Sequence, residues 1–335
     1  MIAMYVLLDG FDLGAGAIHF LVAKTDNERR QVVASIGPVW DGNEVWLLAA
    51  GGTLYFAFPA LYASGFSGFY LPLTIVLWLL MLRGISIEFR NHIKSAVWSP
   101  LWDFLFCASS LLLAVFFGAA LANVVRGVPL DASGYFFEPL WTNFRLGDET
   151  GILDWYTIVV GVLTLLALAM HGGLWVRLKT TGAVGERACR LASKTWWGVV
   201  TLTALVTGMT FRIQPQLMEN FTARPWGFIF PALAVAGLAG VRWFHRVEVR
   251  RAELRAFFAS CAYLAGMLTS VVFGVYPMVL PARNPVYSLT ITNARAADYG
   301  LKIGLAWWVL GMILAGGYFT FVYRSFAGKV SVDKD

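Results

Sequence analysis

Two acidic clusters inside otherwise apolar stretches contain the side chains best suited to chemistry. The first, LDGFDLGAG, holds Asp9 and Asp12, and the second, SIGPVWDGNEVWLLAAGG, holds Asp41 and Glu44. An ionisable side chain inside an apolar span is costly, so each is a functional candidate unless a cap or an ion pair accounts for it. Carboxylates in such places can relay protons or bind a cation. The residues therefore favour proton or ion movement.

The spacing of Asp9 and Asp12 puts both carboxylates on one face of a helix. Gly10, Gly14 and Gly16 in the same segment permit close approach of a neighbouring helix. Two interpretations stay open. The aspartates form a proton relay or cation site, or backbone donors and a neighbouring arginine hold them and they fix helix packing.

Asp41 and Glu44 stand where a polar connection enters an apolar stretch, so a carboxylate there can face both water and the protein interior. That position suits a proton entrance. The spacing also predicts a capping box, with Asp41 as N-cap and Glu44 at the third helical position. The two roles are compatible, because a capping carboxylate beside a dry core can also titrate.

A third charged group, in LRGISIEFRNH, consists of Arg83, Glu88 and Arg90. We predict an ion pair among these residues within the last turns of one helix, because pairing lowers the cost of burying charge. Their expected role is structural support.

Candidate metal and haem ligands are few. Of the four histidines, only His19 and His171 lie in apolar stretches, and the sequence has no CxxCH attachment motif. Cys107, Cys189 and Cys261 have neither metal-type nor disulfide-type spacing. The sequence also has no P-loop, GxSxG or HExxH motif, so hydrolysis and nucleotide-driven transport have no support. We predict that the chain binds no metal and no cofactor.

Membrane-spanning helices are the elements that must position these residues. The chain is 58% hydrophobic and 14% charged, whereas soluble domains are about 25% charged. Continuous apolar runs of about 20 residues predict helices, since barrel strands are about ten residues long and alternate in polarity. The fold class is all-α, with nine predicted spans at 2–24, 44–63, 66–87, 101–124, 152–176, 195–211, 227–244, 257–280 and 300–323.

The net charge of +6 indicates orientation rather than nucleic-acid binding, because of where the positive charges lie. Most Lys and Arg residues stand near the odd-numbered connections and in the C-terminal tail. Positive charge is retained on the cytoplasmic side, which predicts an N-terminus outside and a cytoplasmic C-terminus. No cleavable signal peptide is expected, since Asp9 and Asp12 interrupt the first apolar run and no basic region precedes it.

We expect a single integral membrane domain over residues 1–335. It divides into a first helical bundle at 1–124, a second at 152–280 and a ninth helix at 300–324, without a convincing internal repeat. The longest outer connection, about 125–151, is rich in aromatic residues and is expected to fold onto the membrane interface.

Three segments closely resemble subunit II of the cytochrome bd ubiquinol oxidase family. They are LDGFDLGAG, the run from NERRQVVASIGPVWDGNEVW to GFSGFYLPL, and LRGISIEFR, and together they cover mainly residues 5–92. The resemblance implies a heterodimer in the bacterial cytoplasmic membrane that oxidises quinol and reduces dioxygen to water. Haem b and haem d would belong to the partner, subunit I. This chain would bind no haem and would contact lipid and quinone.

The family motif WDGNxVW falls on Trp40, Asp41, Gly42, Asn43, Glu44 and Trp46. The resemblance places its aspartate on a proton path to the partner's oxygen site, which makes Asp41 the principal residue, assisted by Glu44, Asp9 and Asp12. One departure is that only eight residues precede Asp9, which extend about 12 Å as a helix. The outer end of the first helix is therefore expected to be short.

Two other interpretations remain open at this level. The chain could be an independent ion or small-solute transporter, whose carboxylates bind a coupling cation. Alternatively, it could be solely an assembly subunit with capping and packing carboxylates.

Overall fold

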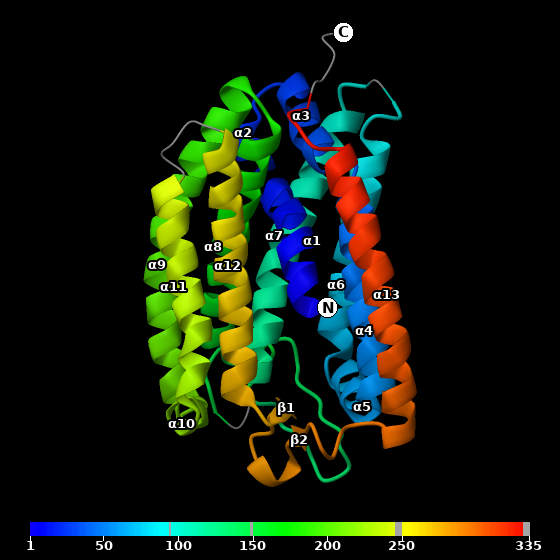
Figure 1. The fold of residues 1–335 in the computed structure, drawn as a ribbon, viewed down its shortest axis with the longest axis vertical. Helices are drawn as coiled ribbons and strands as arrows, with labels where there is room; N and C mark the ends of the chain where they lie inside the picture. Colours follow the sequence, from blue (N-terminus) through cyan, green and yellow to red (C-terminus); the bar gives the residue numbers. More distant parts are fainter. Residues whose placement is uncertain (94, 148–149, 245–249, 331–335) are drawn as a thin grey trace.

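The computed structural model describes residues 1–93, 95–147, 150–244 and 250–330, and most of its helices run along one common axis (Figure 1). Its α-helices are α1 (Ile2–Ala17), α2 (His19–Val22), α3 (Asp26–Ile36), α4 (Trp40–Ala57), α5 (Pro59–Gly68), α6 (Tyr70–Phe89), α7 (Trp98–Arg126), α8 (Trp155–Lys179), α9 (Gly182–Ile213), α10 (Gln216–Ala223), α11 (Ile229–Phe244), α12 (Arg250–Val275) and α13 (Asp298–Ser325). Short 3₁₀ turns lie at Pro225–Phe228 and Pro285–Tyr287, and strands β1 (Met278–Leu280) and β2 (Leu289–Thr290) pair antiparallel.

Eight of the nine predicted spans fall on a helix or on consecutive helices, whereas the span predicted at 257–280 runs past the end of α12 into β1. Among the described residues, six helical segments are long and apolar enough to cross a membrane: Tyr70–Phe89, Trp98–Arg126, Trp155–Lys179, Pro225–Phe244, Arg251–Val275 and Asp298–Ser325. The other three predicted spans lie on α1, α4 and α9. Helix α1 has only 16 residues, and α4 carries Asp41, Asn43 and Glu44 in its first turns. Nine spans therefore stay a prediction, while the all-α class is confirmed.

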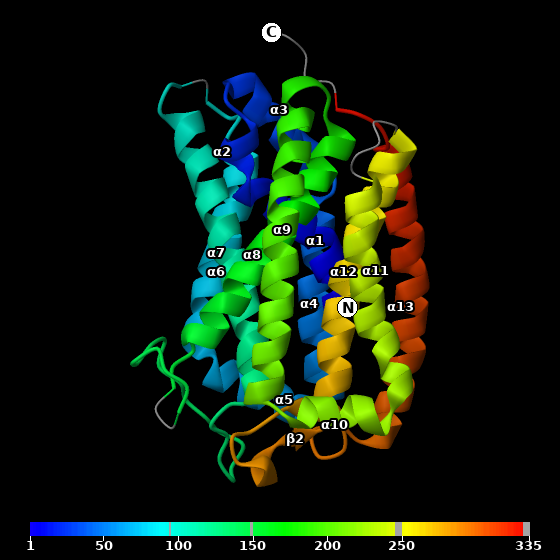
Figure 2. The same ribbon diagram turned by 90° about the vertical axis from the view of Figure 1, so that its left-hand side faces the viewer.

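The ends of the helices separate the connections into two groups (Figures 1 and 2). The α2–α3 segment, the α8–α9 connection and the end of α13 lie at one end of the molecule. The strands and the long segment between α7 and α8 lie at the other. This grouping matches the alternation that positive charge predicts, and the assignment of the first end to the cytoplasm stays a prediction. The N-terminus lies midway along the axis, consistent with a short first helix (Figure 1).

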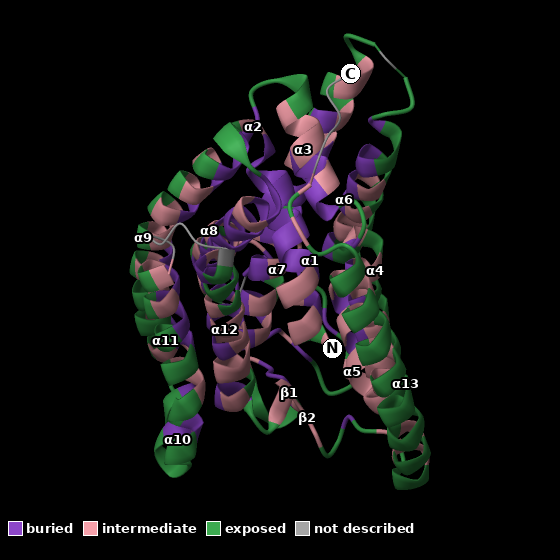
Figure 3. Cartoon of the chain, turned by 45° about the horizontal axis from the view of Figure 1, so that its top comes forward, coloured by how far each residue is buried: buried purple, intermediate pink, exposed green. Residues whose placement is uncertain are grey.

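Helix α1 lies at the centre of the molecule. Every residue from Asp9 to Ala17 is buried (Figure 3). A Cβ atom on Gly14 would stand 1.9 Å from the carbonyl oxygen of Leu168, and one on Gly172 would stand 2.4 Å from the amide nitrogen of Ala15. The two backbones thus touch at a pair of glycines, as small-residue packing in membranes allows.

One hydrophobic cluster joins the two predicted bundles. It includes Phe11 of α1, Leu79 of α6, Leu163 of α8 and Phe257 of α12. Helix α13 differs, because none of its residues is buried (Figure 3). The bundles therefore share a core, and α13 lies on its outside.

The long connection between α7 and α8 folds back on the helix ends. Phe136 is 2% exposed and fills the space beside Gly68, and Val128 forms a bridge with Ala282. Arg126 pairs with Glu138 and Asp154, and Glu138 also accepts a hydrogen bond from Arg283. These contacts tie the connection to the segment around β1.

We expect Gly14→Ala to destabilise the fold, because the new Cβ atom would collide with the backbone of α8. Overpacking of this kind costs about 1–3 kcal/mol. Thermal unfolding in detergent should show a lower midpoint for this variant. Gly311→Ala is the matched control, since nothing lies within 4 Å of its Cβ position. Equal midpoints for both variants would contradict the close α1–α8 contact.

Candidate functional site

A buried ion pair between α1 and α6 is the centre of the site. The Arg83 guanidinium donates to both oxygens of Asp9, at 2.7 Å and 2.5 Å, and neither side chain is exposed. Arg83 also donates to Glu44 on α4 at 3.2 Å. The pairing of Asp9 with a neighbouring arginine agrees with the structural interpretation of that aspartate. One guanidinium therefore joins three helices.

The prediction that Arg83, Glu88 and Arg90 pair with one another is wrong. Arg90 instead donates to Asp103 of α7 at 2.6 Å and to Asp26 of α3 at 2.7 Å. Glu88 is exposed and forms no ion pair with either arginine. Both arginines lie on the buried face of α6, where the nearest carboxylates belong to other helices.

Asp12 is bound differently from Asp9, although both are fully buried. Its Oδ2 atom accepts a hydrogen bond from the Asn43 side-chain amide at 2.7 Å, whereas no group within the described parts of the chain bonds Oδ1. The Tyr323 hydroxyl of α13 donates to the side-chain carbonyl oxygen Oδ1 of Asn43 at 2.8 Å. Asp12 is thus a carboxylate bound to an amide, next to an arginine already occupied by Asp9 and Glu44.

The capping box predicted for Asp41 and Glu44 is wrong, because α4 begins two residues earlier than that prediction requires. Trp40 is the first helical residue, Val39 is the N-cap, and no side chain caps the helix. Asp41 is exposed, and its Oδ1 atom accepts from the backbone amide of Gly42 at 2.7 Å. In the first turn its charge still meets the positive end of the helix dipole.

Glu44 lies between the surface and the interior. Its side chain is 24% exposed, while its carboxylate reaches the buried Arg83. Glu44 is thus partly exposed and also contacts the interior, while its role at a proton entrance stays a prediction. Since Asp41 is three residues earlier on the same helix, the two side chains lie on one face. A path from the surface inward therefore reaches Glu44 first and then the buried ion pair of Asp9 and Arg83.

The remaining residues of the WDGNEVW segment hold α4 against its neighbours. Trp40 packs over Gly84 of α6, where a Cβ atom would stand 3.3 Å from the indole. Gly42 lies next to Tyr318 of α13, and Trp46 packs against Phe319 with ring centroids 5.4 Å apart. These contacts hold α4 against α6 and α13, with the Asn43 side chain buried and the Glu44 carboxylate reaching Arg83.

Two residues that contact the buried polar groups escaped the sequence analysis. Asp103 is an ionisable residue in a predicted span, and that signal was available. It accepts hydrogen bonds from Arg90 and, at 2.9 Å, pairs with His19. Tyr323 gave no signal, because a tyrosine near the end of a span is common at membrane interfaces. Its contact with Asn43 crosses 280 residues of sequence.

His19 and His171, the two histidines in predicted spans, both have hydrogen-bond partners. His171 Nε2 lies 3.0 Å from the Leu7 carbonyl oxygen, which can only accept, and Nδ1 lies 2.7 Å from the Ser260 hydroxyl. Both ring nitrogens of His171 are therefore occupied. His19 Nε2 is occupied by Asp103, whereas no group in the described parts of the chain bonds its Nδ1 atom. Within the described residues, no group of three or more His, Cys, Asp or Glu side chains could hold a metal ion.

A second charged contact ties α3 to α9 at the end predicted to be cytoplasmic. The Glu28 carboxylate accepts two hydrogen bonds from Arg187, at 2.8 Å and 2.9 Å, and forms a capping box with Thr25. The Arg187 hydrogen bonds are the main cause that lowers the pKa of Glu28 from 4.5 to about 2, with further lowering by backbone amides.

The chain matches known proteins over nearly its whole length. The family model described as cytochrome bd terminal oxidase subunit II matches residues 1–326. The "Probable cytochrome oxidase subunit 2" of Haemophilus influenzae is 31% identical, covering 98% of this chain and 92% of that protein. The "Cytochrome bd-I ubiquinol oxidase subunit 2" of Escherichia coli K12 is 31% identical, covering 89% and 84%.

A solved structure has the same fold. The bd oxidase from Geobacillus thermodenitrificans superposes with a TM-score of 0.74 at 19% identity. The superposition covers 97% of this chain and 94% of the matched chain.

We expect Arg83→Gln and Asp9→Asn each to destabilise the fold strongly, because each leaves a buried charge without its partner. Breaking such a pair costs about 3–5 kcal/mol. The double variant should lose much less than the sum, since both charges are then gone. Thermal unfolding of the three variants in detergent measures this coupling. Additive losses would show that the two side chains do not interact.

Stability should also depend on pH through Glu28. Its folded pKa of about 2 lies below its ordinary value of 4.5, so the carboxylate stabilises the fold above pH 4.5 and loses that effect as pH falls toward 2. Glu28→Gln should therefore lower the unfolding midpoint at pH 7, and the gap should narrow between pH 4.5 and pH 3. Glu186→Gln, at an exposed site, is the control. If the difference in unfolding midpoint between Glu28→Gln and the unmodified protein did not change with pH, the effect could not be assigned to the Glu28 carboxylate.

Proposed function

Because this chain belongs to the cytochrome bd terminal oxidase subunit II family and is thus a multi-pass subunit of a bacterial inner-membrane quinol oxidase, we propose that it conducts protons from the cytoplasm toward an oxygen-reducing site in its partner. The observation that carries the proposal is the environment of Asp12. This buried carboxylate has one oxygen bonded to an amide and one without a partner in the described chain.

A proton carrier must be able to gain and lose its proton. Asp9 is poorly suited, because both of its oxygens are bonded to Arg83. Asp12 has no guanidinium of its own, and a proton on its Oδ1 atom would disturb no existing hydrogen bond. We therefore assign the carrier role to Asp12 and a fixed electrostatic role to the Asp9–Arg83 pair.

The entry route leads from Asp41 to Glu44. Asp41 is exposed in the first turn of α4, and Glu44 is partly exposed one turn further in. The contact of Glu44 with Arg83 brings it into the same cluster as Asp9 and Asp12. A proton taken up at the surface therefore has carboxylates at successive depths along one helix face.

Asn43 and Tyr323 position the carrier. An amide neither gains nor loses protons near neutral pH, so Asn43 orients the Asp12 carboxylate and is itself oriented by the Tyr323 hydroxyl. This contact also fastens α13 to α4. Since α13 has no buried residue, we expect the partner to cover the face formed by α4 and α13.

We propose that the haems of the complex, haem b and haem d, are bound by the partner, subunit I. The chemical support comes from His171, because both of its ring nitrogens are already bonded, while His19 is bonded through Nε2 only. Quinol oxidation and oxygen reduction would then take place in the partner. This chain would supply protons, helix contacts and surfaces for lipid and quinone.

Family membership disfavours an independent ion transporter, and purification separates the two functions. A subunit must copurify with a protein that shows a haem spectrum, whereas a transporter would be active without one. A purely assembly role differs in another way, since it predicts that carboxylate variants change the amount of complex rather than its turnover.

We expect Asp12→Asn to lower oxygen consumption with quinol at least tenfold while the haem spectrum and the amount of complex stay unchanged. The amide keeps the shape and removes the exchangeable proton. Asp41→Asn should slow turnover less, because Glu44 remains open to the surface.

The matched control is Asp131→Asn, which changes an exposed carboxylate at the opposite end of the molecule. Its turnover should equal that of the unmodified complex. Normal turnover of Asp12→Asn would sink the proton route, and loss of complex without loss of turnover per haem would support the assembly role.

A further inference from the structure

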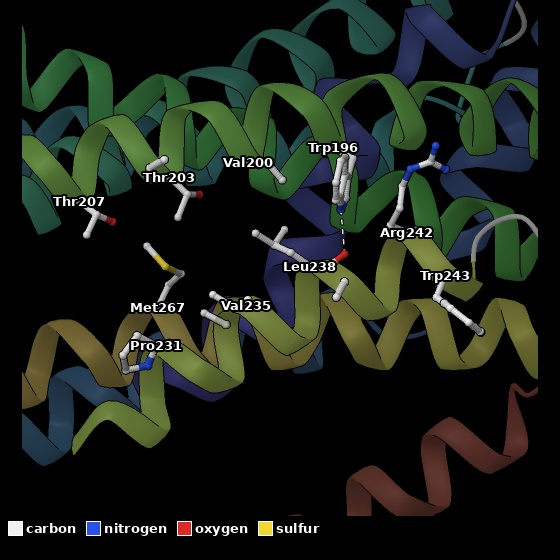
Figure 4. A pocket seen from close by; sticks show the side chains of 13 residues that line it. Trp196, Val200, Thr203, Thr207, Pro231, Val235, Leu238, Arg242, Trp243 and Met267 are labelled. Atoms are coloured by element: carbon white, nitrogen blue, oxygen red, sulfur yellow. Dashed lines mark hydrogen bonds between the residues drawn. The ribbon is translucent and has the colours of Figure 1, made fainter. Parts of the chain in front are cut away.

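A groove lies between α9 and α11 (Figure 4), and both helices stand on the side of the molecule away from α13 (Figure 1). Its volume is about 910 Å³. Small and apolar side chains such as Val200, Ala204, Val235 and Ala239 line it, and Met267 of α12 forms part of its floor. None of these residues takes part in the proton route.

The groove follows the helices. It extends from Trp196 to Thr207 along α9 and from Pro231 to Arg242 along α11, and eleven residues of helix rise about 16 Å. Such a long apolar space fits a hydrocarbon chain better than a compact ring. The Thr203 hydroxyl within it is already bonded to Tyr263 at 2.7 Å.

The groove results from the way the helices pack, and α11 is not loosely held. Helices α11 and α12 pack tightly, because a Cβ atom on Gly237 would stand 2.5 Å from the amide nitrogen of Tyr263 and one on Gly266 would stand 2.5 Å from that of Ala234. Helix α11 is thus held firmly on its α12 side. The space on its α9 side persists because small side chains face it.

One end of the groove is basic and aromatic. Arg242 lies 5.9 Å above the ring of Trp196, whose indole nitrogen donates to the Leu238 carbonyl oxygen at 2.9 Å. Trp243 beside it is 76% exposed. No carboxylate among the described residues pairs with Arg242. Tryptophan and arginine at the end of an apolar path are typical of a lipid headgroup region.

We propose that this groove binds an anionic phospholipid of the cytoplasmic leaflet. Its phosphate would lie at Arg242, and one acyl chain would fill the space between α9 and α11. Charge complementarity selects the occupant, because the cation lies at the mouth while the walls are apolar. The guanidinium can donate two hydrogen bonds to phosphate. The proposal does not depend on the proton route.

Native mass spectrometry of the purified, delipidated oxidase complex tests it. The complex is titrated with phosphatidylglycerol and with phosphatidylcholine of identical chains. Unmodified complex should bind phosphatidylglycerol more tightly, and Arg242→Gln should weaken that binding about tenfold. Arg190→Gln, which removes an exposed arginine of α9 outside the groove, should leave it unchanged.

A second variant tests the chain-binding part separately. Ala239→Phe should fill the groove and weaken binding of both lipids, and Ala204→Phe replaces it if the first variant does not assemble. The site would be overturned if the unmodified complex bound both lipids equally tightly and Arg242→Gln left both affinities unchanged. Unchanged phosphatidylglycerol binding in a groove-filling variant, or its stoichiometric displacement by a quinone with an isoprenoid tail, would overturn the assigned occupant.

Discussion

The buried ion pair of Asp9 and Arg83 is the interaction on which the arrangement of the site depends. A guanidinium and a carboxylate that are both without solvent contact lose a large solvation energy, which only close and complete pairing offsets. Two hydrogen bonds to Asp9 and one to Glu44 meet that requirement. They fix α1, α4 and α6 relative to one another, so every other polar contact of the cluster is built on this one.

Close packing makes such a pair possible. Gly14 and Gly172 let the backbones of α1 and α8 touch, and the residues of α1 from Asp9 to Ala17 are all buried. In a dry interior, charge interactions are stronger and unpaired groups are more costly. Within the described cluster, Asp12 Oδ1 and Arg83 Nε are without a hydrogen-bond partner, and of the two only the Asp12 oxygen belongs to a carboxylate that can accept a proton.

Charge is also divided between the two ends of the molecule. At one end Arg90, Asp103 and His19 form a buried network beside the surface contact of Glu28 with Arg187. At the other, Arg126 and its carboxylate partners fasten the long connection. Fixed ion pairs thus stabilise both ends of the molecule, while the carboxylates with incomplete pairing lie between the two ends.

The sequence by itself determined that the chain is a helical membrane protein, which segments form its helices, and which carboxylates deserve attention. These properties follow from local composition, because burying a span in lipid requires a continuous apolar run wherever it packs. The sequence did not determine which side chains pair with one another. Arg83 was expected to pair within its own helix but bonds Asp9, 74 residues away, and Tyr323 completes the environment of Asp12 through Asn43. Only the tertiary structure decided these contacts, because they depend on which helix faces meet.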